Sequence, residues 1–324
     1  MPAPGAGIDP LIALHPVEPA LFPRTQRPAR SGPVAWRRAP LAGHAALEAE
    51  AAAHAWGSEP SAPPPAAPPG VPVVGVPLAL TDYPRTMDWI DETVRRRARG
   101  YVCVATVHTV MACQEDPALR EAIAGSSLTV PDGQPLVWAL NALGHPLPGR
   151  VYGPELIARY CERSAHTGTR MFLYGGRNQG ALVQLALNLR LRFPGVQIAG
   201  GYSPPHRPLT DEERDAVAAE IDRVRADVVW VGIGVPKQEK WMHEMRPLLR
   251  APVLVGVGAA FDFHAGLVAQ APNWMQNLAL EWLFRLANEP RRLWRRYARY
   301  NPRFVAGFTR QWLAHMLTRP PRSG

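Results

Sequence analysis

Short apolar runs and longer amphipathic stretches follow one another along most of the chain. The apolar runs have the length of strands and are continuously hydrophobic, which predicts strands buried on both faces of a sheet. These runs are VPVVGVPL (71–78), YVCVATV (101–107), LTVPDG (128–133), RMFLYGG (170–176), VQIAGGY (196–202), ADVVWVGIGV (226–235) and APVLVGVGAAF (251–261).

The amphipathic stretches between these runs have the periodicity of helices. Thr81 or Asp82 is a cap for the first of them, Thr210 and Glu213 are spaced as a capping box, and Gly144 ends another. The predicted helices cover residues 82–98, 108–126, 134–144, 153–168, 178–192, 209–226 and 236–249. Strands that alternate with helices predict an α/β fold: a Rossmann-like parallel sheet with helices on both faces.

The two ends of the chain differ in composition from this core. Residues 1–70 hold 15 of the 36 prolines, together with many alanines. Such a segment cannot bury enough apolar surface to offset the entropy lost on ordering. We therefore predict three parts: a disordered leader over residues 1–70, an α/β core over 71–271 and a basic helical appendage over 272–324.

The predicted appendage is rich in arginine. Ten arginines but only one acid, Glu289, follow Glu281, with Trp, Phe, Leu and Tyr between them. The pattern predicts two or three amphipathic helices that are broken at Pro290 and Pro302. Basic helices with aromatic residues suit an anionic membrane surface. Packing against the core and binding to nucleic acid are the alternatives.

The chain as a whole is basic too. Its 324 residues carry a formal net charge of +9, with a pI near 10.0, which favours a polyanionic partner: nucleic acid, an anionic membrane or a phosphorylated substrate. No apolar run reaches the ~18 residues of a membrane span, and the first residues lack the pattern of a signal peptide. We expect a protein that is soluble or peripheral to a membrane.

Polar and glycine-rich residues follow the predicted strands. They include Thr106, Gly175, Gly176 and Gly234. Because open parallel sheets bind ligands beyond the carboxyl ends of their strands, we expect these segments to meet at one crevice.

Asp132 is the candidate for acid–base chemistry. It lies between Pro131 and Gly133, directly after a strand, so that the backbone holds its carboxylate in a fixed direction. A positioned carboxylate is able to remove the proton from an attacking hydroxyl. The alternative is an aspartate that only caps the turn.

Further segments carry candidate binding residues. Arg150 follows a PLPG turn, and its guanidinium suits a phosphate or carboxylate, with a surface ion pair as the alternative. GIGVPKQE places Lys237 and Gln238 at a glycine turn that opens a helix, where free N–H groups attract phosphate. Asp262 follows the last strand and either accepts from sugar or ribose hydroxyls or caps the next segment.

Several familiar motifs are missing from the sequence. It contains no DxD acidic pair, no HExxH and no GxSxG, and GIGVPK has Lys237 where a dinucleotide fingerprint needs its last glycine. We expect no bound metal and no cofactor. Cationic side chains and helix dipoles would then stabilise an anionic leaving group.

Together these segments resemble the WecG/TagA/CpsF glycosyltransferase family over roughly residues 72–300. The order and spacing of the matching runs carry the resemblance. The runs are DPALREAI, PDGQPLVW, RVYGPEL, FLYGG, VGIGVPKQEKWM, GVGAAFDFHAG, APNWMQ and LEWLFRLANEPRRLWRRY.

The resemblance implies an inverting, metal-independent transferase at the inner membrane face. Such enzymes move a sugar from a UDP-sugar to an undecaprenyl-diphosphate-linked saccharide, for teichoic acid, enterobacterial common antigen or exopolysaccharide. By position in the family motifs, Asp132 is the implied catalytic aspartate, Arg150 an active-site arginine and Gln238 the PKQE glutamine. Tyr202 and Asp262 fall at positions associated with UDP binding. The implied appendage arginines are Arg285, Arg292 and Arg295.

One segment departs from the family pattern. The usual Thr-x-Asn at the end of the first strand is here Val104 and Thr106, with His108 two residues on. The change bears on the identity of the donor sugar, and His108 is either a compensating residue or a histidine on a helix surface. Two other classes of protein compete with a transferase: another nucleotide-binding α/β enzyme, and a non-catalytic membrane- or nucleic-acid-binding protein. We expect no nucleic-acid partner.

Overall fold

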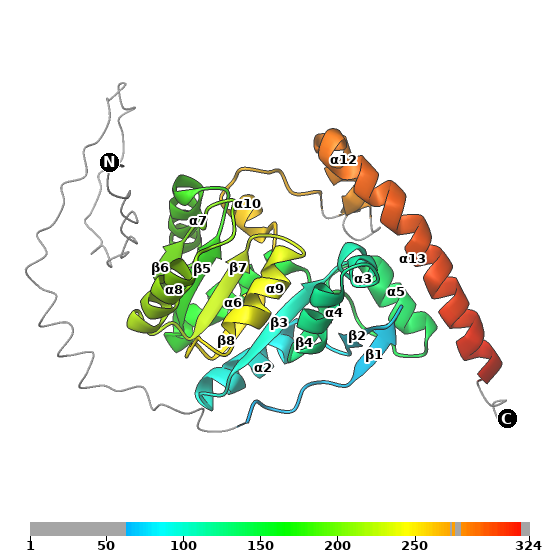
Figure 1. Cartoon of the computed structure of the whole chain (residues 1–324), viewed down its shortest axis with the longest axis horizontal. Coiled ribbons are helices and arrows are strands. Elements are labelled where there is room, and N and C mark those ends of the chain that lie inside the picture. Colours follow the sequence, from blue (N-terminus) through cyan, green and yellow to red (C-terminus); the bar gives the residue numbers. More distant parts are fainter. Residues whose placement is uncertain (1–62, 273, 276–279, 319–324) are drawn as a thin grey trace, which may run out of the picture.

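The computed structural model describes residues 63–272, 274–275 and 280–318 (Figure 1). The predicted leader lies mostly outside these residues. Its last part is described and contacts the core: the Pro65 carbonyl accepts from Trp89 Nε1 at 3.1 Å, and the Pro69 carbonyl accepts from the Leu80 N–H at 2.9 Å.

A six-stranded parallel sheet forms the centre of the molecule, in the order β4-β3-β8-β7-β5-β6. The predicted Rossmann-like α/β fold is confirmed. The strands are β3 (Gly100–Ala105), β4 (Leu128–Pro131), β5 (Arg170–Gly175), β6 (Gln197–Tyr202), β7 (Val228–Gly232) and β8 (Val253–Gly256).

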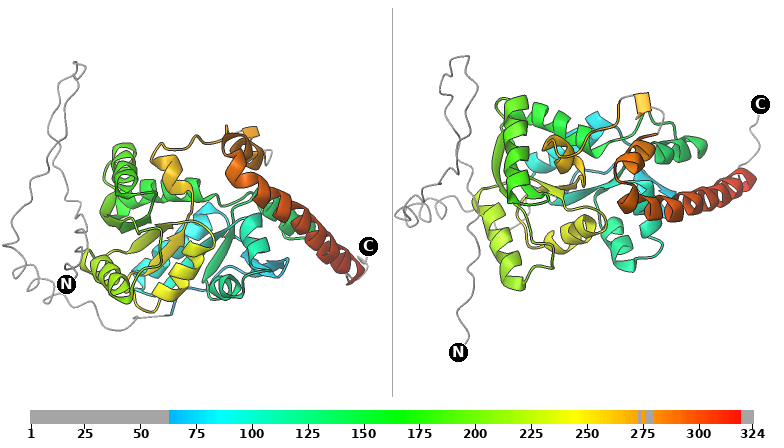
Figure 2. Two further views of the ribbon diagram at one scale, coloured as in Figure 1. Left: turned by 45° about the horizontal axis from the view of Figure 1, so that its top comes forward. Right: turned by 90° about the horizontal axis from the view of Figure 1, so that it is seen from above.

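Helices connect the strands and cover both faces of the sheet (Figures 1 and 2). The predicted capping box at Thr210 and Glu213 is present, and Gly144 adopts the left-handed backbone expected at the end of its helix. These helices are α2 (Tyr83–Arg95), α3 (Val107–Ala112), α4 (Pro117–Ala124), α5 (Gln134–Ala142), α6 (Gly153–Thr167), α7 (Gln179–Arg192), α8 (Asp211–Arg223), α9 (Lys237–Met245) and α10 (Ala260–His264).

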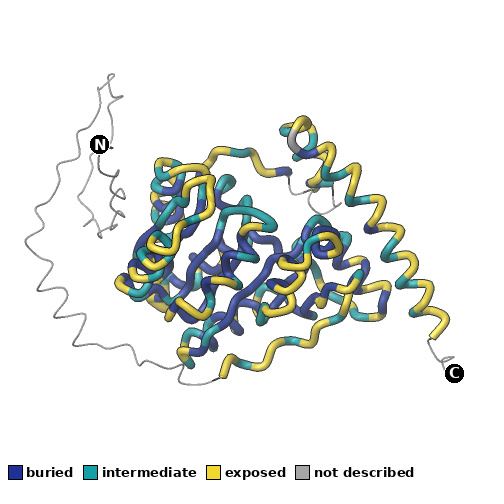
Figure 3. The backbone as a smooth tube through the Cα atoms, in the orientation of Figure 1, coloured by how far each residue is buried: buried dark blue, intermediate teal, exposed yellow. Residues whose placement is uncertain are grey.

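Each face of the sheet has its own apolar core. Successive strand residues point to opposite faces, so Val229 and Val231 join one core whereas Val228 and Trp230 join the other. The middle of the sheet is dark blue in Figure 3, because β3, β4 and β8 are buried at every residue, whereas β6 at the edge is partly exposed. This burial explains the continuous apolar runs in the sequence.

The prediction of a single strand over residues 71–78 is wrong. Residues 71–78 are a separate antiparallel hairpin, with strands β1 (Gly70–Val73) and β2 (Val76–Ala79), and not one strand of the main sheet. Val74 and Gly75 both have positive φ, 49° and 78°, which is the conformation of a two-residue hairpin turn. The apolar run conceals the turn because only one glycine interrupts it.

The predicted helix over residues 108–126 is two helices. Asp116 accepts from the Leu119 N–H at 3.1 Å and caps a new helix that begins at Pro117. The Asp-Pro pair in the sequence carries this signal.

The described part of the appendage contains the helices α12 (Glu281–Asn288) and α13 (Pro290–Thr318). The predicted break at Pro290 is confirmed, but the predicted break at Pro302 is wrong, because α13 continues through it. A proline inside a helix costs about 3 kcal/mol. Leu293 before it and Phe304 after it are both buried, so packing on the core offsets that cost.

Polar contacts fasten α13 to the core beside α3 and the hairpin (Figure 2). The Gln311 side chain accepts from the Val74 N–H at 2.7 Å and donates to the Pro72 carbonyl at 2.6 Å. Glu115 accepts from Arg299 at 2.9 Å and also pairs with Arg303. In the described part of the chain, no helix is both long and apolar enough to cross a membrane.

Candidate active site

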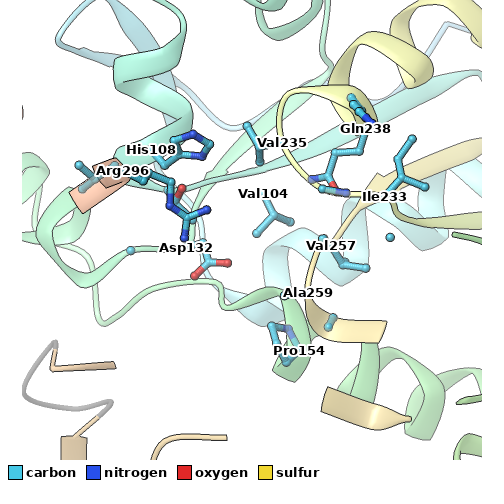
Figure 4. A pocket seen from close by; sticks show the side chains of 18 of the residues that line it. Val104, His108, Asp132, Pro154, Ile233, Val235, Gln238, Val257, Ala259 and Arg296 are labelled. Atoms are coloured by element: carbon cyan, nitrogen blue, oxygen red, sulfur yellow. The ribbon is translucent and has the colours of Figure 1, made fainter. Parts of the chain in front are cut away.

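A pocket of about 1240 Å³ opens at the carboxyl ends of the parallel strands. Residues that follow β3, β4, β5, β7 and β8 line it, and α12 and α13 of the appendage close one side. Figure 4 shows Asp132, His108 and Arg296 on one side of the pocket, with Gln238 and Ile233 on the other. The crevice predicted from the strand ends therefore exists.

Asp132 is held in this pocket by the sheet and by a helix. Its N–H donates to the Ala105 carbonyl at 2.8 Å, which extends the pairing of β3 and β4 by one residue. Its Oδ2 accepts from the N–H of Gly153, the first residue of α6, at 3.3 Å. The helix that follows, α5, has no side-chain cap, so Asp132 is not the cap of its own turn.

Arg150 is half-buried beside Asp132 and contacts the appendage. Its Nη1 lies 2.9 Å from Glu281 Oε2, and both side chains are almost inaccessible, at 14% and 11% exposure. Its guanidinium also lies 4.2 Å from the centre of the Tyr152 ring. The alternative was a surface ion pair. Arg150 does form an ion pair, with Glu281, but the pair lies in the pocket and not at the surface.

The electrostatic surroundings of Asp132 favour a proton acceptor near neutral pH. Burial raises the pKa of Asp132 to about 7, and the charge of Glu281 adds to the rise. Arg150, the Gly153 N–H and Arg285 act in the opposite direction. A carboxylate with a pKa near the working pH is suited to general base catalysis.

The segment after β3, which departs from the family pattern, places His108 in the pocket. Thr106 caps α3 through a capping box with Thr109. Thr106 and Val104 also line the pocket. His108 lies in the pocket near Arg296 (Figure 4). Burial and the charge of Arg296 lower the pKa of His108 to about 4, so its imidazole is neutral.

The GIGVPKQE turn is braced from within. Gln238 is buried, its Oε1 accepts from the Gly234 N–H at 3.2 Å, and its Nε2 donates to Glu239 Oε1 at 2.9 Å. Its amide thus holds the glycine turn. Lys237 is exposed at the first residue of α9 and lines the pocket.

Two of the binding positions predicted in the α/β core are not among the described residues that line the pocket. Gly175 packs against the backbone of Gly232 instead, whereas Gly176, next to it, does line the pocket. The ring of Tyr202 lies 6.0 Å from that of Tyr174, which is itself a lining residue.

Asp262 lines the pocket and does not cap the helix in which it lies. Its Oδ1 accepts from Arg177 Nε at 3.1 Å. Of its two predicted alternatives, the cap is wrong. An aspartate paired with an arginine at the pocket rim remains available to ligand hydroxyls.

The appendage contributes arginines, but not all of those predicted. Arg285 lines the pocket, whereas Arg295 is exposed and lies over the Trp294 ring. The side chain of Arg292 is outside the described residues. Sequence reasoning missed Arg296, which lines the pocket. Among the described residues, the Nε atoms of Arg285 and Arg296 are buried without a hydrogen-bond partner.

Sequence reasoning also missed Glu281 as a site residue. It is the last acid before the run of arginines, and its two oxygens bind Arg150 and Tyr152. Its position at the start of α12, inside the matching run LEWLFRL, was the available signal. No group of three His, Cys, Asp or Glu side chains that could hold a metal ion occurs in the described part of the chain.

The fold and the site together define an α/β enzyme with a carboxylate and several arginines at the ends of its parallel strands. The chain belongs to the glycosyl transferase WecG/TagA/CpsF family, whose model matches residues 71–317. The protein is therefore a glycosyltransferase.

Two curated relatives from Bacillus carry the same name, N-acetylglucosaminyldiphosphoundecaprenol N-acetyl-beta-D-mannosaminyltransferase. The protein of Bacillus spizizenii is 30% identical over 197 residues, which cover 61% of this chain and 74% of the relative. The protein of Bacillus subtilis is 29% identical over 223 residues, which cover 68% of this chain and 84% of the relative.

Proposed function

We propose that this glycosyltransferase moves a hexose or N-acetylhexosamine-type sugar from a UDP-sugar to a saccharide linked to undecaprenyl diphosphate. The names of both Bacillus relatives support an acceptor of this kind and a sugar of the N-acetylmannosamine type. The proposal includes inversion at the anomeric carbon and no requirement for a metal or other cofactor.

In the proposed reaction Asp132 is the catalytic base. An acceptor hydroxyl gives its proton to the Asp132 carboxylate as its oxygen bonds to the anomeric carbon of the donor. The bond from that carbon to the diphosphate oxygen breaks, and its electron pair leaves with UDP. The observation that carries the proposal is a carboxylate with a pKa raised to about 7, fixed by Gly153 at the pocket wall.

Cations around the pocket would stabilise the departing diphosphate. Arg285 and Arg296 present buried Nε atoms that lack partners among the described residues, which suits ligand oxygens. Arg150 adds charge beside Asp132. Lys237 lies at the N-terminus of α9, where the helix dipole also favours an anion. Positive groups that already surround a leaving group stabilise the transition state.

Other pocket residues would position the donor. Gly176 and Gly234 leave room for its close approach, and Gln238 supports the Gly234 turn from behind. Asp262 would accept from its hydroxyls, and Thr106 lines the sugar end of the pocket in our proposal. Gly175 and Tyr202 would act indirectly, through Gly232 and Tyr174, and Arg295 would face the membrane.

Product analysis tests the proposed function. A panel of UDP-hexoses and UDP-N-acetylhexosamines is offered with a synthetic polyprenyl diphosphate that carries N-acetylglucosamine, with and without EDTA. We expect one donor to extend the lipid by a single sugar, seen by mass spectrometry, and EDTA to leave the rate unchanged. The absence of product with every donor would contradict the proposal, and a loss of activity in EDTA would refute its metal independence.

We also propose that the appendage holds the protein to the inner face of the cell membrane as a peripheral protein. The exposed apolar side chains of Trp294, Val305, Leu313 and Leu317 lie along α13, a helix that also carries exposed arginines. Such a helix binds through both apolar burial and attraction to anionic lipids.

Vesicle binding should depend on salt and on lipid charge. We expect the full chain to sediment with vesicles that contain phosphatidylglycerol, and to be released as salt is raised to about 0.5 M, where exposed charges are screened. Leu313→Ser should weaken binding without changing its salt dependence, because it removes apolar area only. Equal binding at low and high salt would refute the electrostatic part of the proposal.

A further inference from the structure

The carboxylate of Glu281 joins the appendage to the catalytic side of the pocket. Glu281 begins α12 and is only 8% exposed. Its Oε2 accepts from Arg150 Nη1 at 2.9 Å, and its Oε1 accepts from the Tyr152 hydroxyl at 2.9 Å. Tyr152 directly precedes Gly153, whose N–H holds Asp132. Both oxygens of Glu281 are thus bound to the segment that faces the proposed base.

Two carboxylates, Asp132 and Glu281, compete for the single positive charge of Arg150. Arg150 is the largest influence that opposes the rise of the Asp132 pKa, and Glu281 adds to that rise. Without the charge of Glu281, the guanidinium would lose this carboxylate partner, and its charge would favour an ion pair with Asp132. Such a pair would lower the pKa of Asp132 and occupy the oxygen that has to accept the proton.

We propose that Glu281 is a positioning residue of the transferase, which holds Arg150 away from Asp132 and thereby keeps the Asp132 carboxylate free to act as the base. The inference rests on the proposed function. It also makes the base depend on the appendage, since a carboxylate that holds Arg150 belongs to α12 and not to the α/β core.

Two contacts of Tyr152 support a positioning role for Glu281. The Arg150 guanidinium lies over the Tyr152 ring at 4.2 Å, while the hydroxyl of the same tyrosine binds Glu281. Arg150 is therefore restrained on one side by a ring and at its end by a carboxylate. A contact that served only to fasten α12 would not need to restrain the guanidinium twice.

Other charged and titratable groups also face Asp132. They are Arg285 of α12, Tyr83 of α2 and Tyr152, with His108 of α3 and Arg296 of α13 on the same side of the pocket (Figure 4). His108 is neutral, with its pKa lowered to about 4. Burial raises the pKa of Tyr83 and Tyr152 and lowers the pKa of His108, which moves these three groups away from the Asp132 pKa of about 7. Glu239, beside Gln238, also has a pKa raised to about 7, so the profile of Asp132→Asn is needed to assign the acid limb to Asp132.

Glu281→Gln tests the proposal, because glutamine keeps the size of the side chain and removes its charge. With the full chain, the donor and acceptor identified above and saturating substrate, we expect kcat to fall by about tenfold to a hundredfold. We expect the acid limb of the pH profile to move to lower pH, because the pKa of Asp132 falls. Glu281→Asp, which keeps the charge, should leave the limb near its wild-type position.

A double-mutant cycle and a matched control separate positioning from fastening. If Glu281 acts through Arg150, adding Glu281→Gln to an Arg150→Lys background should cost much less than it does alone. Glu115→Gln is the control: it also removes a carboxylate that fastens the appendage, through Arg299 and Arg303, but it touches neither Arg150 nor Asp132. We expect the acid limb of the pH profile of this control to match that of wild type.

The outcomes are distinguishable from a failure of the proposed function. If wild type transfers the sugar and Asp132→Asn does not, but Glu281→Gln keeps the kcat and pH limb of wild type, the positioning role is refuted while the function stands. If Glu281→Gln and Glu115→Gln change KM and thermal stability alike, without a shift of the limb, Glu281 only fastens α12. If wild type is inactive with every donor, the proposed function itself fails.

Discussion

Asp132→Asn is expected to lower kcat for sugar transfer by about 100- to 10,000-fold, the range contributed by a positioned general base. Asparagine fits the same space and can still accept from the Gly153 N–H, so the fold and the pocket should persist. Its amide cannot take up a proton from the acceptor. Because Asp132 contacts the hydroxyl in our proposal and not UDP, the affinity for UDP measured by calorimetry should change little.

Asp88→Asn is the matched control for this variant. Asp88 is an exposed carboxylate that pairs with Arg163 at the surface, away from the pocket. We expect the control to keep wild-type kcat, since exposed ion pairs contribute little. Full activity in Asp132→Asn would remove this residue as the base and show that another group takes up the proton.

Gly175→Ala is expected to have the largest effect on stability. Gly175 has φ of 136°, and a Cβ at this position would lie 2.6 Å from the carbonyl carbon and oxygen of Gly232 on the paired strand. Backbone atoms of a central sheet cannot move aside. Backbone strain of about 1–3 kcal/mol and forced overpacking of about 1–3 kcal/mol together predict a loss on the order of 4 kcal/mol in the free energy of unfolding.

Gly168→Ala separates the cost of backbone strain from the cost of overpacking. Gly168 also has a positive φ, 70°, but no atom lies within 4 Å of its ideal Cβ. This variant should lose only about 1–2 kcal/mol, the cost of a left-handed alanine. Urea unfolding of both variants makes the comparison. Equal losses would mean that the close approach of Gly175 to Gly232 adds nothing.

The local pattern of the sequence was sufficient to predict the parallel sheet and its helices. Continuous apolar runs require burial on both faces, and cap residues such as Thr210 mark helix starts. The hairpin at Val74 and the passage of α13 through Pro302 were not predictable in this way. The first depends on a turn hidden in an apolar run, and the second on contacts of Leu293 and Phe304 with a distant core.

The candidate site was predictable where it depends on strand ends and not where it depends on the appendage. Parallel sheets bind ligands beyond the carboxyl ends of their strands, and this rule predicts Asp132 and Gly234, which both line the pocket. Glu281 lies 131 residues from Arg150 in the sequence, and no local pattern links them. Arg296 could not be chosen over Arg295, because the face that a helix turns to the pocket is set by its docking.

The pH dependence of a single turnover tests the central claim most directly. Enzyme saturated with donor and acceptor is quenched at intervals from about pH 5 to about pH 9, for wild type and Asp132→Asn. The active form of Asp132 is deprotonated, so the wild-type rate should rise with pH through about 7 and then level off. The variant should be slow, without that rise. A variant that keeps the same rise would show that another group is the base.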